Sequence, residues 1–129
     1  MSGSVLLDTN IVIGLFAKDQ AVLARLSESA RVFIPSIVVG ELYFGAYKST
    51  QPKGNVHRIE ELVAASAVLV CDATTAEYYG RIKKALRDKG RPLPENDIWI
   101  AALAQQHGLI VVSRDQHFKE IEGLPVEAW

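Results

Sequence analysis

The sequence has few of the residues that crosslink small domains covalently or through zinc. Cys71 is the single cysteine among 129 residues, which excludes an intramolecular disulfide and a multi-cysteine zinc site. The three histidines, His57, His107 and His117, do not have the spacing of a zinc motif. A chain without disulfides is typical of a reducing compartment, so we expect it in the cytoplasm.

Long apolar runs and an excess of one charge sign are also missing. No stretch approaches the roughly 20 apolar residues that span a bilayer, and the polar start MSGS lacks the basic region and cleavage site of a signal peptide. Fourteen Lys and Arg against 15 Asp and Glu give a net charge of −1. Nucleic-acid binding would therefore need a local basic patch.

Three common catalytic motifs are absent as well. The chain has no G-x-S-x-G, which argues against a serine hydrolase. It has neither a Walker loop nor G-x-G-x-x-G, so it lacks the phosphate cradle of nucleotide-binding domains. Any catalytic chemistry must come from other side chains.

What the sequence does contain is a regular alternation of apolar segments. Hydrophobic residues make up 49% of the chain, enough for the core of one domain over residues 1–129. We predict strands at 4–8, 31–35, 67–71, 109–113 and 124–129, and helices at 11–16, 19–30, 37–49, 56–66, 75–89 and 97–107, with a short helix within 114–123. Because the strands are continuously apolar, this pattern predicts an α/β fold, a three-layer α/β/α sandwich around a mostly parallel sheet of about five strands.

Local signals set the expected helix boundaries. Ser36 is predicted to cap the helix 37–49, and Thr74 with Glu77 matches a capping box for the helix 75–89. Pro and Gly within 49–55 predict a loop, and Gly108 is expected to end the helix 97–107.

Four acidic residues occupy positions that packing alone does not favour. Asp8 ends the first strand, Asp97 opens the most apolar helix, and Asp115 follows the strand 109–113. Glu41 lies among apolar residues of the helix 37–49, where a charge usually needs a partner. Taken singly, the aspartates could be caps or turn residues. Because parallel sheets form sites beyond the carboxyl ends of their strands, we predict that the four acids form one cluster.

Such a cluster needs a cation. Two carboxylates about 5 Å apart repel by about 3 kcal/mol at an effective dielectric constant of about 20, and a bound Mg²⁺ or Mn²⁺ removes that repulsion. The ion would also hold a phosphate group and activate a water for in-line attack. Four polar residues beside the acids are candidates to orient the site, with capping as the alternative role: Thr9, Asn10, Asn96 and Ser113.

Basic residues near two of the acids support a phosphate-containing substrate. The candidates for phosphate contact are Lys83, Lys84, Arg87, Arg91 and Arg114. The alternative is a solvated helix surface, since exposed helices are often rich in Lys and Arg.

Four segments, in this order along the chain, resemble the PIN domain and, more narrowly, the VapC toxins of bacterial type II toxin–antitoxin pairs. They are LLDTNIVIGLF, IPSIVVGELYFGA, PENDIWIAALAQQHGLIVVSRDQHF and LPVE. The resemblance implies an α/β/α sandwich and Mg²⁺- or Mn²⁺-dependent cleavage of RNA by activated water. It also implies a metal-binding cluster of Asp8, Glu41, Asp97 and Asp115, supported by Thr9 and Ser113, with Asn96 in the place before the third acid.

The resemblance further implies partners. A VapC-like protein acts on RNA, forms a homodimer, is inhibited by a cognate VapB-like antitoxin that inserts a segment near the acids, and reaches promoter DNA only through that complex. Three alternatives stay open: a receiver-like phosphoryl-transfer domain, a non-enzymatic protein whose acids bind an antitoxin arginine, and a protein that binds RNA without cutting it. The receiver is disfavoured because Asp8 has no acidic neighbour.

Overall fold

The computed structural model describes residues 3–29 and 31–129, and in this part of the chain five strands form one sheet. They are β1 (Val5–Leu7), β2 (Val32–Pro35), β3 (Ala67–Leu69), β4 (Ile110–Val112) and β5 (Val126–Glu127). The strand order is β3-β2-β1-β4-β5, and every neighbouring pair is parallel. The predicted parallel sheet is confirmed, and all its strands end at the same edge.

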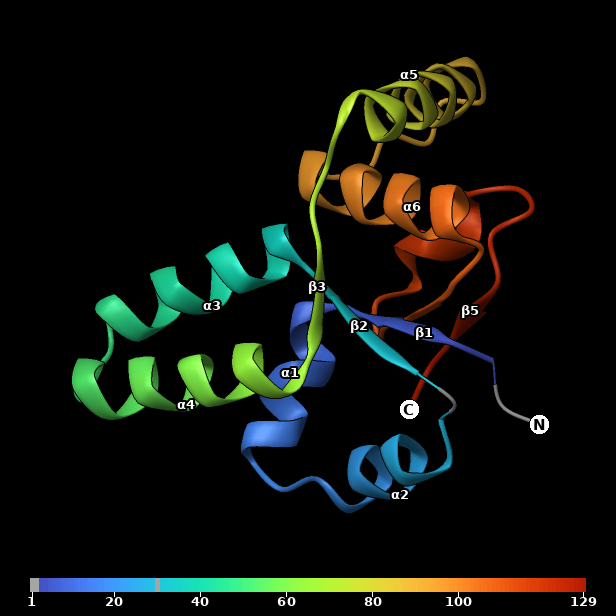
Figure 1. The fold of residues 1–129 in the computed structure, drawn as a ribbon. Helices are drawn as coiled ribbons and strands as arrows, with labels where there is room; N and C mark the ends of the chain where they lie inside the picture. The colour runs from blue at the N-terminus through green and yellow to red at the C-terminus, as the bar shows by residue number, and fades with distance from the viewer. Residues whose placement is uncertain (1–2, 30) are drawn as a thin grey trace.

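Six α-helices and one 3₁₀ helix occur in the same described ranges. They are α1 (Thr9–Phe16), α2 (Gln20–Glu28), α3 (Ser36–Tyr47), α4 (Pro52–Ala65), α5 (Ala73–Asp88), α6 (Glu95–His107) and η1 (Gln116–Glu120). Figure 1 shows α5 and α6 on one side of the sheet and α1, α2 and α4 on the other, which confirms the α/β/α layers. Helices α3 and α4 lie side by side and extend together away from the sheet.

The order in which the chain connects the strands explains why the helices cover both faces of the sheet. The chain passes from β1 to β2 to β3 in one direction across the sheet and then returns to β4 on the far side of β1. Because parallel crossovers are right-handed, the reversal moves the later helices to the opposite face. Within the described ranges, no helix has the length and apolar character needed to cross a membrane.

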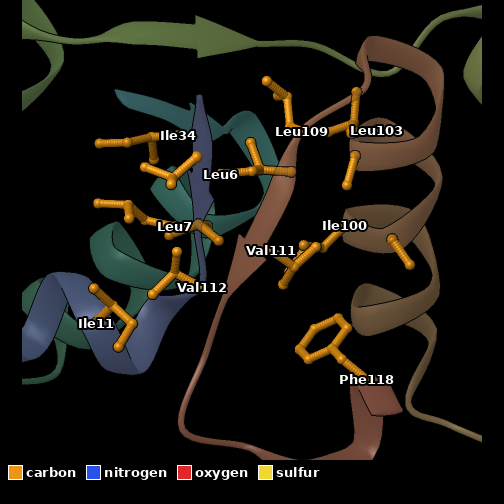
Figure 2. Packing of buried hydrophobic residues seen from close by; sticks show 14 of the residues in the cluster. Leu6, Leu7, Ile11, Ile34, Ile100, Leu103, Leu109, Val111, Val112 and Phe118 are labelled. Carbon is orange, nitrogen blue, oxygen red and sulfur yellow. The ribbon is translucent and has the colours of Figure 1, made fainter. Parts of the chain in front are cut away.

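Apolar side chains on both faces of the central strands position the helices. Leu6 is in register with Val111, and Leu7 with Val112, on the adjacent strands β1 and β4. Successive residues of a strand face opposite sides, and Figure 2 shows Val111 facing Ile100 of α6. All five residues are at most 1% exposed. This packing fixes the first turn of α6 relative to the ends of β1 and β4.

Two predicted helix caps are wrong. Ser36 is the first residue of α3, and Pro35 takes the cap position without a side-chain hydrogen bond. Helix α5 is capped by Asp72 rather than Thr74: Asp72 Oδ1 accepts from the Thr75 amide at 3.1 Å, and Thr75 Oγ1 accepts from the Asp72 amide at 3.0 Å. The capping box therefore exists two residues earlier, with Thr75 rather than Glu77 as its second member.

Five helices begin one to four residues earlier than predicted, α4 and α6 among them. Helix α4 starts at Pro52 rather than at residue 56, because proline is well suited to the first turn, where its missing amide has no helical partner. Helix α6 starts at Glu95 rather than Asp97 and ends as predicted at Gly108, whose φ of 66° is left-handed. Asp97 is therefore the third residue of α6 rather than the first.

Candidate metal centre

Asp8 is held at the carboxyl end of the central strand β1. Its backbone amide donates to the Val112 carbonyl at 3.0 Å, and the residue is 6% exposed. Asp8 Oδ1 accepts from the Thr9 amide at 2.8 Å, so the residue also caps α1. A carboxylate offers about four lone-pair sites, so the cap leaves capacity on Asp8 for a cation.

Ser113 and Asn10 connect Asp8 to the loop that follows β4. Ser113 Oγ donates to Asp8 Oδ2 at 2.6 Å, and Asn10 Nδ2 donates to the same oxygen at 3.3 Å. Ser113 Oγ accepts from the Asp115 amide at 3.0 Å, and Asn10 Oδ1 accepts from the Arg114 amide at 3.1 Å. The predicted contacts of these two polar residues with the acids are present, and they hold the Asp8 carboxylate and the Asp115 backbone in one network.

Asp97 faces these residues from the first turn of α6, and its side chain is 16% exposed. Burial and the negative charges of Asp8 and Asp115 raise the pKa of Asp97 to about 6, although His117 opposes the rise. Asp97 therefore lies close enough to Asp8 and Asp115 to be affected by their charges. A carboxylate perturbed by desolvation and by two like charges is typical of a functional site.

Asp115 and His117 close the cluster at the start of η1. Asp115 Oδ1 accepts from the His117 amide at 3.0 Å and lies 2.9 Å from His117 Nδ1. The same nitrogen is 3.6 Å from Asp97 Oδ2. One ligand atom from each of the three residues lies within 4.8 Å of the other two. Sequence analysis missed His117 because it tested the histidines only for zinc spacing, although its position two residues after Asp115 was a signal.

Glu41 contacts Thr9, the residue that follows Asp8. Glu41 is exposed on α3, and its Oε1 accepts from Thr9 Oγ1 at 3.0 Å. The partner of this acid is therefore a hydroxyl of the residue that follows Asp8. Both residues border a hollow of about 240 Å³ whose other walls include Ile13, Phe16, Gly45 and Arg58.

Asn96 borders a different hollow. Although it precedes Asp97 in the sequence, it is exposed and lines a space of about 360 Å³ together with Ser36, Val70, Cys71 and Trp99. Of the four polar candidates, the structure brings Thr9, Asn10 and Ser113 to the acids by hydrogen bonds.

Most of the candidate phosphate-binding residues are paired with acids on their own surface. The pairs are Lys83 with Glu95 (2.5 Å), Lys84 with Asp88 (2.6 Å), Arg91 with Glu120 (4.0 Å) and Arg114 with Asp19 (2.9 Å). Arg87 is exposed and lines a hollow with Lys83. Arg114 is the member joined to the acidic network, because its amide donates to Asn10. Exposed ion pairs contribute little to stability and open easily.

The donor set fits a divalent cation. Carboxylate oxygens are the ligands that Mg²⁺ and Mn²⁺ prefer, and imidazole nitrogen binds transition-metal ions better than it binds Mg²⁺. Ligands about 2.1 Å from one octahedral ion lie about 3.0 Å apart when adjacent and about 4.2 Å apart when opposite. The separations of 2.9 and 3.6 Å around His117 suit such a shell. A cation here would also remove the repulsion that raises the pKa of Asp97.

Comparisons with known proteins show what this chain is similar to in sequence and in structure. Residues 5–124 match the PIN domain family. The chain is 38% identical over 127 residues to Ribonuclease VapC2 of Haemophilus influenzae and 36% identical over 127 residues to the tRNA(fMet)-specific endonuclease VapC of Shigella flexneri, with 96% of both chains covered each time. The DNA-bound VapBC structure from Salmonella typhimurium matches with a TM-score of 0.90 and 32% identity, covering 100% of this chain and 99% of that one.

Proposed function

This chain belongs to the PIN-domain family, in the group of VapC ribonucleases, and from this premise we propose that it is a metal-dependent endoribonuclease. The observation that carries the proposal is the convergence of Asp8, Asp97 and Asp115 at one sheet edge, where burial and the charges of Asp8 and Asp115 raise the pKa of Asp97 to about 6. Three carboxylates in one half-buried site are poorly stable without a cation and well suited to hold one.

Each residue has a distinct part in this proposal. A bound Mg²⁺ or Mn²⁺ would neutralise charge on the scissile phosphate and activate a water for in-line attack. Asp8 and Asp97 would hold the ion directly, and Asp115 and Glu41 would hold it directly or through water. Ser113 and Asn10 fix the orientation of the Asp8 carboxylate. A preorganised carboxylate needs no rearrangement when the substrate binds.

Thr9 has a different role, because it contacts Glu41, the exposed member of the four candidate acids. Its hydroxyl donates to Glu41 and so directs this carboxylate toward the strand edge where Asp8 lies. Because Glu41 is exposed, a phosphate can approach the cluster from this side. Asp8, in contrast, is buried.

The biological role we propose is that of the toxin in a toxin–antitoxin pair. The solved relative from Salmonella typhimurium is a VapBC complex bound to DNA, which supports a VapB-like antitoxin and DNA binding by the toxin–antitoxin complex. A homodimer and promoter binding only through that complex are part of the same proposal. The hollow beside Glu41 supports an antitoxin contact, because Ile13 is 56% exposed there. Phe44 and Tyr47 add exposed apolar surface on the same helix as Glu41.

The test is cleavage of end-labelled RNA by the purified chain with Mg²⁺, with Mn²⁺ and with EDTA. We expect cleavage only with metal, and its loss in Asp8→Asn and Asp97→Asn. Asp88→Asn is the matched control, because Asp88 is an exposed acid paired with Lys84 on α5. Cleavage that persists in EDTA, or full activity of Asp8→Asn, would contradict the proposal, and RNA binding without cleavage would favour a non-catalytic role.

A further inference from the structure

We infer that His117 is a nitrogen ligand of the bound cation and that it makes this site selective for Mn²⁺ over Mg²⁺. This inference rests on the proposed metal-dependent function and concerns the identity of the ion. His117 follows Asp115 at the start of η1, and its ring points into the acidic cluster rather than away from it.

The ring nitrogen already lies where a ligand atom is needed. His117 Nδ1 is 2.9 Å from Asp115 Oδ1 and 3.6 Å from Asp97 Oδ2. Adjacent ligands of an octahedral ion are about 3.0 Å apart, so an ion bound by both carboxylates would have Nδ1 within reach of its coordination shell. Without the ion, His117 Nδ1 lies between a carboxylate oxygen of Asp115 and one of Asp97.

The turn that carries His117 is anchored on both sides. The His117 amide donates to Asp115 Oδ1 at 3.0 Å. The next residue, Phe118, is 0% exposed, and Figure 2 shows its ring in the core below α6. The imidazole itself is 52% exposed, so it can move by a few tenths of an ångström toward an ion while its backbone stays in place. An anchored backbone with a free ring is a suitable arrangement for a ligand.

The selectivity follows from the chemistry of the donor. Mg²⁺ is bound almost entirely by oxygen, whereas imidazole nitrogen is a good ligand for transition-metal ions. Coordination through Nδ1 requires its lone pair, so the ring proton must be on Nε2. Removing the nitrogen should therefore weaken Mn²⁺ binding and leave Mg²⁺ binding almost unchanged.

The competing role for His117 is purely electrostatic. A ring that only balances the charge of Asp97 and Asp115 would leave when any divalent cation enters, and it would not distinguish Mn²⁺ from Mg²⁺. The two roles differ in one observable, which is a bond between nitrogen and the bound metal. That observable does not depend on nuclease activity.

The experiment is pulsed electron paramagnetic resonance of Mn²⁺ bound to the full chain, together with calorimetric titration of Mn²⁺ and Mg²⁺. We expect imidazole ¹⁴N modulation in the unsubstituted protein and none in His117→Gln. The affinity of His117→Gln for Mn²⁺ should fall about tenfold or more, with the affinity for Mg²⁺ changed less than about twofold. His57→Gln is the control, because His57 is an exposed histidine on α4 paired with Glu61, and it should behave as the unsubstituted protein.

The outcomes separate this inference from the function on which it rests. Mn²⁺ that binds without ¹⁴N modulation, or modulation that persists in His117→Gln, overturns the role of His117 and leaves the metal-dependent nuclease intact. A protein that binds neither ion overturns both. Because His117 is half-exposed, circular dichroism of His117→Gln should match that of the unsubstituted protein and confirm that the variant is folded.

Discussion

Ser113 Oγ donates a 2.6 Å hydrogen bond to Asp8 Oδ2, although 105 positions separate the two residues in the sequence. The contact exists because β1 and β4 are adjacent and in register, with Leu7 opposite Val112 one residue earlier. Both Ser113 and Asp8 are buried. The orientation of a candidate metal ligand on the first strand is therefore controlled by the fourth strand.

Ser113→Ala tests this control. The substitution removes a buried donor to a charged acceptor, for which a loss of about 1.5–3 kcal/mol in the free energy of unfolding is expected. Metal affinity should fall about tenfold, because the Asp8 carboxylate loses its support. Urea denaturation in EDTA and calorimetric titration with Mn²⁺ measure the two effects. Ser27→Ala, on the exposed surface of α2, is the control, and an unchanged Mn²⁺ affinity in Ser113→Ala would argue against the support role.

Glu41→Gln separates activity from stability. Glu41 is exposed and contacts Thr9 Oγ1 through Oε1, so the amide can keep this hydrogen bond while the charge is lost. We expect a change in unfolding free energy within about 0.5 kcal/mol and a clear fall in RNA cleavage. Glu60→Gln, an exposed acid on α4, should retain activity. If Glu41→Gln and Glu60→Gln cleave RNA equally well, Glu41 is not part of the site.

Measurements of RNA cleavage and RNA binding can rank the basic residues by their contribution to substrate binding. Lys84 is paired with Asp88 one turn along α5, and both side chains are largely exposed. Arg114 is next to Asp115 and joins Asn10 through its backbone amide, and its guanidinium pairs with Asp19. We expect Arg114→Gln to raise KM for RNA and to reduce the salt dependence of binding. Lys84→Gln should leave KM and the salt dependence unchanged. Equal effects of Arg114→Gln and Lys84→Gln would support a phosphate-binding role for α5.

The sequence predicted the aspartates of the site because each is a local anomaly. A carboxylate directly after a continuously apolar run marks the end of a strand, and parallel strands end at one edge. The alternation of strands and helices then gives the layers without any knowledge of side-chain contacts. These inferences need only chain order and polarity, and both are visible in a single sequence.

The positions of Asn10, Asn96 and His117 depend on three-dimensional contacts that the order of residues in the sequence does not show. Asn10 and Asn96 each stand beside an acid, but Asn10 reaches Ser113 from the start of α1, whereas Asn96 borders another hollow. Successive residues of a helix point about 100° apart, so adjacency to Asp97 does not place Asn96 in the same site. His117 of η1 meets Asp97 of α6 only in the folded chain, and the spacing of the histidines in the sequence does not show this contact.

The pH dependence of stability gives the sharpest test of the acidic cluster. The pKa of Asp97 is raised from 3.8 to about 6 in the folded chain, so between these values the folded protein holds a proton that the unfolded chain has released. The free energy of unfolding in EDTA should therefore fall as pH rises from about 4 to about 6, by about 2 kcal/mol at about 1.4 kcal/mol per pKa unit with allowance for partial exposure.

The side chain of Asp97→Asn does not titrate, so the free energy of unfolding of this variant should not show the Asp97 part of the fall between pH 4 and pH 6. Near pH 7 and without metal, the variant should therefore be more stable than the unsubstituted protein. Urea denaturation from pH 4 to 7.5 in EDTA measures the difference, and Asp88→Asn should keep the decline because Asp88 is exposed on α5. Mn²⁺ should stabilise the unsubstituted protein more at pH 7 than at pH 5, since the ion competes with the Asp97 proton. Parallel stability curves for Asp97→Asn and the unsubstituted chain would mean that Asp97 does not experience the charges of Asp8 and Asp115, and the single-cluster proposal would fail.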